Sequence, residues 1–157
     1  METDDELIER VAIEQEPQIS AVELRHVEWY WPRVRDWILA ALQESVLHEL
    51  SEAEIYRACL KGEYLMLVLA IGDSLCGVAV LTASKDPMGR NYMAVICCGG
   101  IQVHRWLGLL VNTCRLLAHD IGAREIILMG RPGWRAMLAP MGLKLRAVVM
   151  VLDLEKR

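Results

Sequence analysis

Two spacings of hydrophobic residues alternate along this chain of 157 residues. In four stretches the apolar residues recur every three or four positions, which predicts helices with one buried face, at about 34–42, 51–61, 103–121 and 134–141. Local signals mark the ends of these helices. Pro32 fits a first helical turn, Ser51 with Glu54 forms a capping box, and Gly122 is a typical C-terminal stop.

Between these stretches lie apolar runs of strand length. They predict strands at 18–24, 64–71, 75–84, 91–98, 125–129 and 144–154. The turn sequence Gly72-Asp73-Ser74 joins two of them into a hairpin. The long helix crosses between 91–98 and 125–129, so these two strands are expected to be parallel neighbours. The order of elements predicts an α+β fold, a mixed and mostly antiparallel sheet with helices on both faces.

Composition supports one globular domain after a short arm. Hydrophobic residues make up 54% of the chain and charged residues 24%, which is enough apolar material for a sizeable core. The arm, 1–17, is acidic, and Thr3 with Glu6 predicts a short helix there. Residues 18–157 are expected to form the single domain. The arm also has an apolar stripe, which favours a protein partner, and the body allows a homo-oligomer.

Charge and hydropathy exclude several classes of function. The formal net charge is -4, and no basic stripe is present, so we expect no nucleic-acid partner. No apolar run approaches the roughly 18 residues of a membrane helix, and we expect no membrane partner. The acidic start is unlike a signal peptide, which favours a cytoplasmic protein.

Five cysteines are present, at positions 59, 76, 97, 98 and 114. Their odd number and irregular spacing do not predict a disulfide framework. Cys97 and Cys98 are adjacent in a predicted strand, so their side chains are expected on opposite faces of the sheet. The spacing typical of a zinc site is missing, and we expect no metal. The three aromatic residues Trp29, Tyr30 and Trp31 fit either a ligand wall or packing beneath a loop.

Several short motifs resemble one known family. They are Cys-Cys-Gly-Gly at 97–100, His-Arg-Trp-Leu-Gly at 104–108, Gly-Ala-Arg-Glu-Ile-Ile-Leu at 122–128, Gly-Arg-Pro-Gly-Trp at 130–134 and Met-Gly-Leu at 141–143. Over about residues 18–154 the chain resembles the GNAT (Gcn5-related N-acetyltransferase) superfamily. It is similar in particular to small GNAT-like proteins of tailed bacteriophages and prophages. The segment 55–64 fits the same group.

The resemblance implies a splayed pair of parallel strands, 91–98 and 125–129, with acetyl-CoA in the opening. Strand backbone would bind the pantetheine, and the next helix start would bind the pyrophosphate. The implied cofactor-binding residues are Ile96, Cys97, Cys98, Gly99, Gly100, Arg105 and Gly108. Arg105 and Gly108 fit the signature Q/R-x-x-G-x-G/A, whereas Leu110 departs from it. The same residues also fit a helix start that binds no phosphate, with an exposed arginine and a glycine at a helix crossing.

The family's usual proton donor is missing from this sequence. A tyrosine often stands four residues before the glycine that closes the last helix, but here Leu138 precedes Gly142. The strand 91–98 has no Asp or Glu, so His104 is the candidate catalytic residue. Two functions stay open. One is an acetyl-CoA-dependent N-acetyltransferase acting on an amine, and the other is an inactive GNAT fold that serves as a bacteriophage virion or interaction protein.

Overall fold

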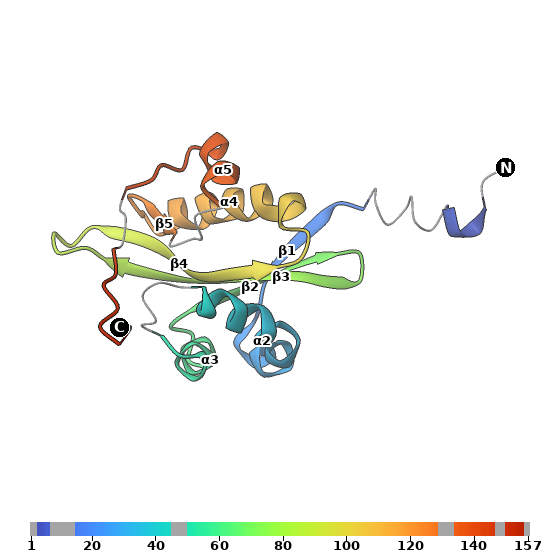
Figure 1. Cartoon of the computed structure of the whole chain (residues 1–157), viewed down its shortest axis with the longest axis horizontal. Coiled ribbons are helices and arrows are strands. Elements are labelled where there is room, and N and C mark those ends of the chain that lie inside the picture. Colours follow the sequence, from blue (N-terminus) through green and yellow to red (C-terminus); the bar gives the residue numbers. More distant parts are fainter. Residues whose placement is uncertain (1–2, 7–14, 45–49, 129–133, 147–149, 156–157) are drawn as a thin grey trace.

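The computed structural model describes residues 3–6, 15–44, 50–128, 134–146 and 150–155 (Figure 1). Its centre is a five-stranded sheet in the order β1-β2-β3-β4-β5. The first four strands pair antiparallel, and β5 pairs parallel with β4. The strands are β1 (Pro17–Ala21), β2 (Leu65–Ile71), β3 (Ser74–Lys85), β4 (Asn91–Gly100) and β5 (Ile126–Leu128).

Helices cover both faces of the sheet. The helical elements are η1 (Leu24–His26), α2 (Val27–Gln43), α3 (Glu52–Leu60), α4 (Val103–Asp120), α5 (Trp134–Leu138) and η2 (Ala139–Met141). Figure 1 shows α2 and α3 on one face and α4 and α5 on the other. The predicted α+β architecture, including the parallel pair joined by the long helix, is therefore confirmed.

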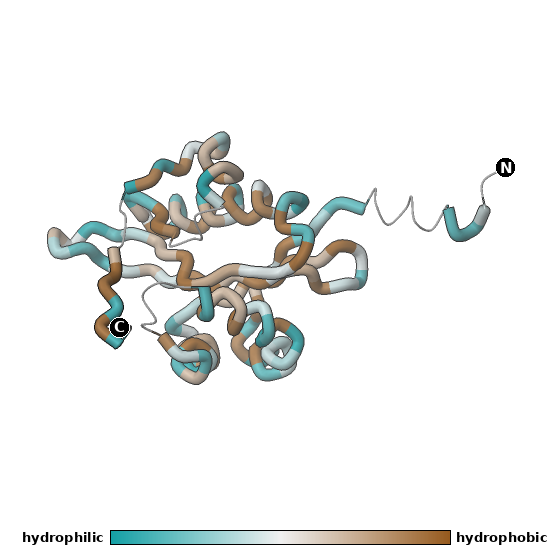
Figure 2. The backbone as a smooth tube through the Cα atoms, in the orientation of Figure 1, coloured by the Kyte–Doolittle hydropathy of each residue, from teal (hydrophilic) through white to brown (hydrophobic). Residues whose placement is uncertain are grey.

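Each face of the sheet has its own hydrophobic core. Val34, Ile38 and Ile55 pack with Val78 and Val80 on the α2–α3 face. The α4 face is built from Leu67, Leu69, Ala79, Leu81, Trp106, Leu110 and Trp134. Side chains of β2 and β3 alternate between the two cores, which explains their uninterrupted apolar runs. Figure 2 shows these strands as a hydrophobic band between the helical layers.

Two predicted element boundaries are wrong. Helix α2 begins at Val27, so Pro32 lies inside the helix and the aromatic cluster belongs to its first two turns. The first strand ends at Ala21, because Leu24–His26 forms a turn of 3-10 helix. The capping box before α3 is confirmed, since the Ser51 hydroxyl accepts a hydrogen bond from the Glu54 amide at 3.2 Å.

The predicted final strand at 144–154 is also wrong where the structure describes it. Residues 144–146 and 150–154 belong to no strand, and residues 147–149 lie outside the described part. Met150 is 91% exposed and Leu152 is 83% exposed. The apolar alternation is therefore present without a neighbouring strand to pair with it. In the described ranges, no helix is long and apolar enough to cross a bilayer.

Candidate functional site

Among the described residues, three pairs join the two parallel strands. Met93 lies opposite Ile126, Ala94 opposite Ile127 and Val95 opposite Leu128. Strand β4 then continues to Gly100, and no described residue of β5 accompanies it. Residues 129–133, which follow β5, lie outside the described part of the structure, so the predicted divergence of the two strands stays a prediction. Beyond Val95, the backbone groups of β4 that face away from β3 have no partner strand among the described residues.

A β-bulge lies in β4 directly after the three described pairs with β5. In the register with β3, Leu81 lies opposite Val95 but Val80 lies opposite Cys97, so Ile96 is the extra residue. The bulge reverses the alternation of side chains. Val95 points into the α4-side core, whereas Cys97 points into the α2-side core and Cys98 into the α4-side core. Bulges are frequent next to active sites because they turn the backbone out of the regular ladder.

Packing accounts for both glycines at the end of β4. A Cβ on Gly99 would lie 3.1 Å from the backbone oxygen of Trp37 in α2. A Cβ on Gly100, where φ is +152°, would lie 2.1 Å from the backbone oxygen of Cys76 in β3. These glycines let α2 and β3 approach β4 closely. They are also the residues that bring the chain to the start of α4.

Trp106 anchors the short connection between β4 and α4. Only Ile101 and Gln102 separate the two elements, and Gln102 has a left-handed backbone with φ of 53°. The indole Nε1 of Trp106 donates a hydrogen bond to the Ile101 carbonyl at 2.8 Å, and the side chain is fully buried. A Cβ on Gly77 would lie 2.8 Å from this ring. The sequence analysis missed this contact, because Trp106 and Gly77 lie far apart in the sequence and the contact leaves no periodic signal.

Arg105 lies in the first turn of α4, where helix geometry favours an anion. Its guanidinium donates to Gln102 Oε1 at 3.1 Å and to the Gln15 carbonyl at 2.7 Å. Gln102 makes no side-chain capping hydrogen bond to the helix. The residue before Arg105, His104, is exposed at the same helix start. The structure thus brings these two predicted site residues to the end of α4 that follows β4.

Gly108 lies farther along α4 and faces η2. A Cβ there would lie 3.9 Å from Met141 Cε, an ordinary contact. A shallow hollow of about 220 Å³ lies here, lined by Gly108, Val111, Asn112, Arg115, Pro140 and Met141. Leu110 is buried in the core between α4 and the sheet, so its side chain faces the sheet. Gly108 therefore lies where α4 meets η2, about one turn beyond Arg105.

The five cysteines are buried and unbonded to one another. Burial raises the pKa of the Cys97 thiol to about 12 and the pKa of Cys59 and Cys114 to about 11. A thiolate is the nucleophilic form, so Cys97 is unsuited to nucleophilic catalysis near neutral pH. Within the described ranges, no group of three or more His, Cys, Asp or Glu side chains could hold a metal ion.

This burial makes a prediction about thiol reactivity. In native protein at pH 8, an aromatic disulfide reagent is expected to modify fewer than one thiol per chain within minutes, because access and ionisation are both suppressed. The absorbance of the released thiolate measures the modification. After denaturation, all five cysteines should react. Rapid modification of Cys97 or Cys98 in the folded protein would contradict the burial described above.

The position of the family's usual proton donor is apolar in the structure as well. Leu138 is the last residue of α5 and is buried, and Trp134 at the start of the same helix is also buried. On β4, Tyr92 is half-buried and pairs across from Ser84. His104 is therefore the exposed imidazole nearest the β4–α4 connection in sequence.

The Arg33 guanidinium lies over the exposed Trp29 ring at 3.5 Å, on the first turns of α2.

Comparison with known proteins supports the fold. No protein-family model matches the chain, and no curated protein matches it. Among solved structures, a ribosomal-protein-alanine N-acetyltransferase from Brucella melitensis is 14% identical, with a TM-score of 0.60 over 87% of this chain and 98% of that one. A GCN5-related N-acetyltransferase from Ralstonia eutropha is also 14% identical, with a TM-score of 0.62 over 89% and 99%.

A third similar structure is glucosamine-6-phosphate N-acetyltransferase from Arabidopsis thaliana. It is 10% identical, with a TM-score of 0.59 over 89% of this chain and 99% of that one. Identities this low leave the common architecture as the shared property. In both the order of its elements and its overlay on these enzymes, the chain has the GNAT fold, with an α+β sheet that includes a parallel strand pair.

Proposed function

We propose that this chain binds acetyl-CoA beside the divergence of β4 and β5 and transfers the acetyl group to an amine. The main support is the parallel pair of β4 and β5 together with the bulge at Ile96, which precedes the start of α4. In this proposal, the β4 backbone from Ile96 to Gly100 would hydrogen-bond the amides of a pantetheine arm. Arg105 and the start of α4 supply positive potential for the phosphates.

The proposed site has seven cofactor-binding residues in two groups. Ile96, Cys97, Cys98, Gly99 and Gly100 contribute backbone groups of β4, whereas Arg105 and Gly108 belong to α4. Bound acetyl-CoA supplies an activated thioester, and the protein's task is to orient it toward an amine nitrogen. Proximity of this kind can lower a barrier by roughly 7–11 kcal/mol when the geometry is exact.

His104 is the proposed acid–base residue of this site. Its exposed imidazole at the start of α4 can take a proton from an incoming amine or pass one to the departing sulfur. General acid–base assistance is worth about 10²–10⁴ in rate. Leu138 cannot donate a proton at the position where the family often has a tyrosine. We therefore expect catalysis to depend mainly on positioning of the thioester and the amine.

A second candidate is the same fold without chemistry, acting as an interaction protein. Two observations favour it. The Arg105 guanidinium already binds the Gln15 carbonyl and Gln102, so phosphates would have to share it or displace these groups. The connection between β4 and α4 is also only two residues long. A place in a bacteriophage particle rests on the sequence resemblance alone.

Calorimetry tests whether the chain binds acetyl-CoA, and a charge-reversal variant tests where its phosphates bind. We expect a Kd below about 1 mM for the unmodified chain and about a 10- to 100-fold weaker Kd for Arg105→Glu, the range for losing a charge-assisted hydrogen bond. Lys61→Glu makes the same charge change at the end of α3, on the opposite face of the sheet. This control is expected to keep its affinity within about twofold.

Equal losses in the two variants would contradict the placement of the phosphates, and a Kd weaker than about 1 mM for the unmodified chain would refute the enzyme. A transfer assay with a panel of small-molecule and peptide amines then distinguishes the two candidates. Acetylation of any amine, slowed in His104→Ala with unchanged acetyl-CoA affinity, supports the transferase. Binding without acetylation of any amine supports the second candidate.

A further inference from the structure

The chain just before β1 contacts the turn between β2 and β3. Pro17, the first residue of β1, pairs with Ile71, the last residue of β2, so Gln15 lies past the end of that pairing. The Gln15 side chain rests on the turn, because a Cβ on Gly72 would lie only 2.4 Å from its Oε1. Figure 1 shows this turn, the beginning of β1 and the start of α4 at the same end of the sheet.

Arg105 binds the same segment from the start of α4. Its Nη2 donates a hydrogen bond to the Gln15 carbonyl at 2.7 Å, and its Nη1 donates to Gln102 Oε1 at 3.1 Å. The β4–α4 connection brings the arginine to this end, since the Ile101 amide donates to the Cys76 carbonyl near the beginning of β3 at 2.8 Å. Gln15 is therefore held at two points, by its side chain on the turn and by its carbonyl on Arg105.

The Gln15 carbonyl occupies a nitrogen that a phosphate would use. A guanidinium binds a phosphate through two nitrogens, either Nη1 with Nη2 or Nε with Nη2. Both arrangements include Nη2, which donates to Gln15. A carbonyl oxygen and a phosphate oxygen are both acceptors, so the two compete for this nitrogen of Arg105. The bond to the anion is the shorter and stronger one, which allows a phosphate to displace the carbonyl.

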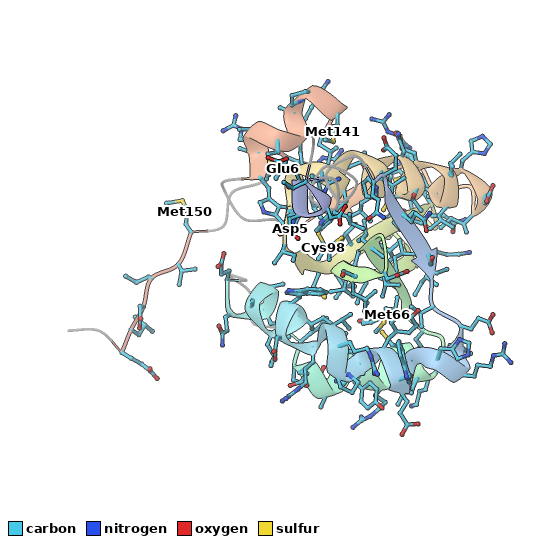
Figure 3. The ribbon with its side chains drawn as sticks, turned by 90° about the vertical axis from the view of Figure 1, so that its right-hand side faces the viewer. Asp5, Glu6, Met66, Cys98, Met141 and Met150 are labelled. Atoms are coloured by element: carbon cyan, nitrogen blue, oxygen red, sulfur yellow. The ribbon has the colours of Figure 1, made fainter. Side chains whose placement is uncertain are left out.

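The segment that makes this contact is strongly acidic. Residues 1–16 include seven acidic side chains and one basic side chain, and Glu16, directly after Gln15, is exposed. Figure 3 views the molecule from this end and shows Asp5 and Glu6 in front of it. Negative charge at this end lowers the local concentration of phosphate anions, which adds to the occupation of Arg105.

We infer that the segment Gln15–Glu16 is a latch on Arg105, which a bound diphosphate group must release. This inference rests on the proposed function, because it concerns the same phosphate site. When the site is empty, the latch keeps the guanidinium paired. When a diphosphate binds, the Gln15 carbonyl passes to water. The apparent affinity falls in proportion to the open fraction, so a latch closed for about nine-tenths of the time weakens binding about tenfold.

Titration of the full chain with inorganic pyrophosphate, followed by NMR, tests the latch. The Gln15 carbonyl and the Glu16 amide belong to one peptide group, so the amide nitrogen shift of Glu16 reports on the hydrogen bond from Arg105. We expect the Glu16 amide signal and the Arg105 Nε–H signal to move together, with one midpoint. In Arg105→Ala, the Glu16 signal should begin at the released position and stay there.

Calorimetry with the same anion measures what the latch does to affinity. Gln15→Ala removes the side chain that rests on the β2–β3 turn, and we expect the Kd for pyrophosphate to become about 3- to 10-fold tighter as the latch opens. Gln18→Ala is the matched control, because it removes the same side chain from an exposed position of β1. Its Kd should stay within about twofold of the unmodified chain.

A shift of the Arg105 signal without a shift of the Glu16 signal would overturn the latch, because the anion would then share the arginine. An unchanged Kd in Gln15→Ala would also overturn it, as would the absence of pyrophosphate binding by either chain at about 10 mM. The proposed function has a separate outcome. A chain that binds pyrophosphate and releases Gln15, but does not bind acetyl-CoA, would refute the enzyme and leave the latch established.

Discussion

Replacing Trp106 with alanine is expected to lower the free energy of unfolding by about 3–5 kcal/mol, the usual cost of removing a buried tryptophan. The side chain is fully buried between α4 and the sheet, and its Nε1 binds the Ile101 carbonyl. The variant would leave both a cavity and an unsatisfied carbonyl at the β4–α4 turn. Chemical denaturation followed by far-UV circular dichroism measures the change.

Trp29→Ala is the matched control for this variant. Trp29 is 55% exposed. Its ring makes an edge contact with the neighbouring Tyr30 ring and lies beneath the Arg33 guanidinium. We expect a loss within about 1 kcal/mol, the value of an exposed cation–π contact. If both tryptophan variants lost similar stability, Trp106 would not be the anchor of the turn.

Periodicity predicted most of the fold because both faces of the sheet are covered. A strand buried on two sides is apolar throughout, as in Leu65–Ile71, and a helix on one face repeats every three or four residues. These patterns are local and can be read from the sequence. The parallel pairing of β4 with β5 followed from the length of the helix that joins them.

Contacts between distant residues could not be read in this way. Trp106 packs on Gly77 from 29 positions away, and Arg105 binds Gln15 across the domain. Neither contact leaves a periodic signal. Residues 150–154 show the opposite case, because their alternation predicts a strand while no strand of the described sheet pairs with them. A hydrophobic pattern records the tendency to be buried and does not identify the partner.

The candidate site was predicted in outline from the resemblance. The parallel pair and the nearby helix start are in the expected places, whereas the divergence stays a prediction because residues 129–133 lie outside the described part. The bulge at Ile96 was not foreseen, because one extra residue in a strand leaves the apolar composition unchanged. From the sequence alone, Gly99 and Gly100 fit a cofactor-binding turn. The structure adds their close contacts with Trp37 and Cys76.

Gly100→Ala is expected to destabilise the fold by roughly 2–6 kcal/mol. About 1–3 kcal/mol comes from a backbone conformation that alanine avoids and a similar amount from overpacking. The new Cβ would lie 2.1 Å from the Cys76 oxygen and 2.6 Å from Gly77 Cα, and both neighbours are backbone atoms. The backbone of a paired strand cannot move aside as a flexible side chain can. Thermal and chemical denaturation measure the loss.

Gly89→Ala separates backbone strain from crowding in this prediction. Gly89 also has a positive φ, +77°, but no atom lies within 4 Å of its Cβ position. Strain alone then costs about 1–2 kcal/mol, and the remainder in Gly100→Ala measures the close approach of β3. If the two variants lost equal stability, packing would not explain Gly100. A loss of acetyl-CoA binding in a fully stable Gly100→Ala would then assign this glycine to the cofactor.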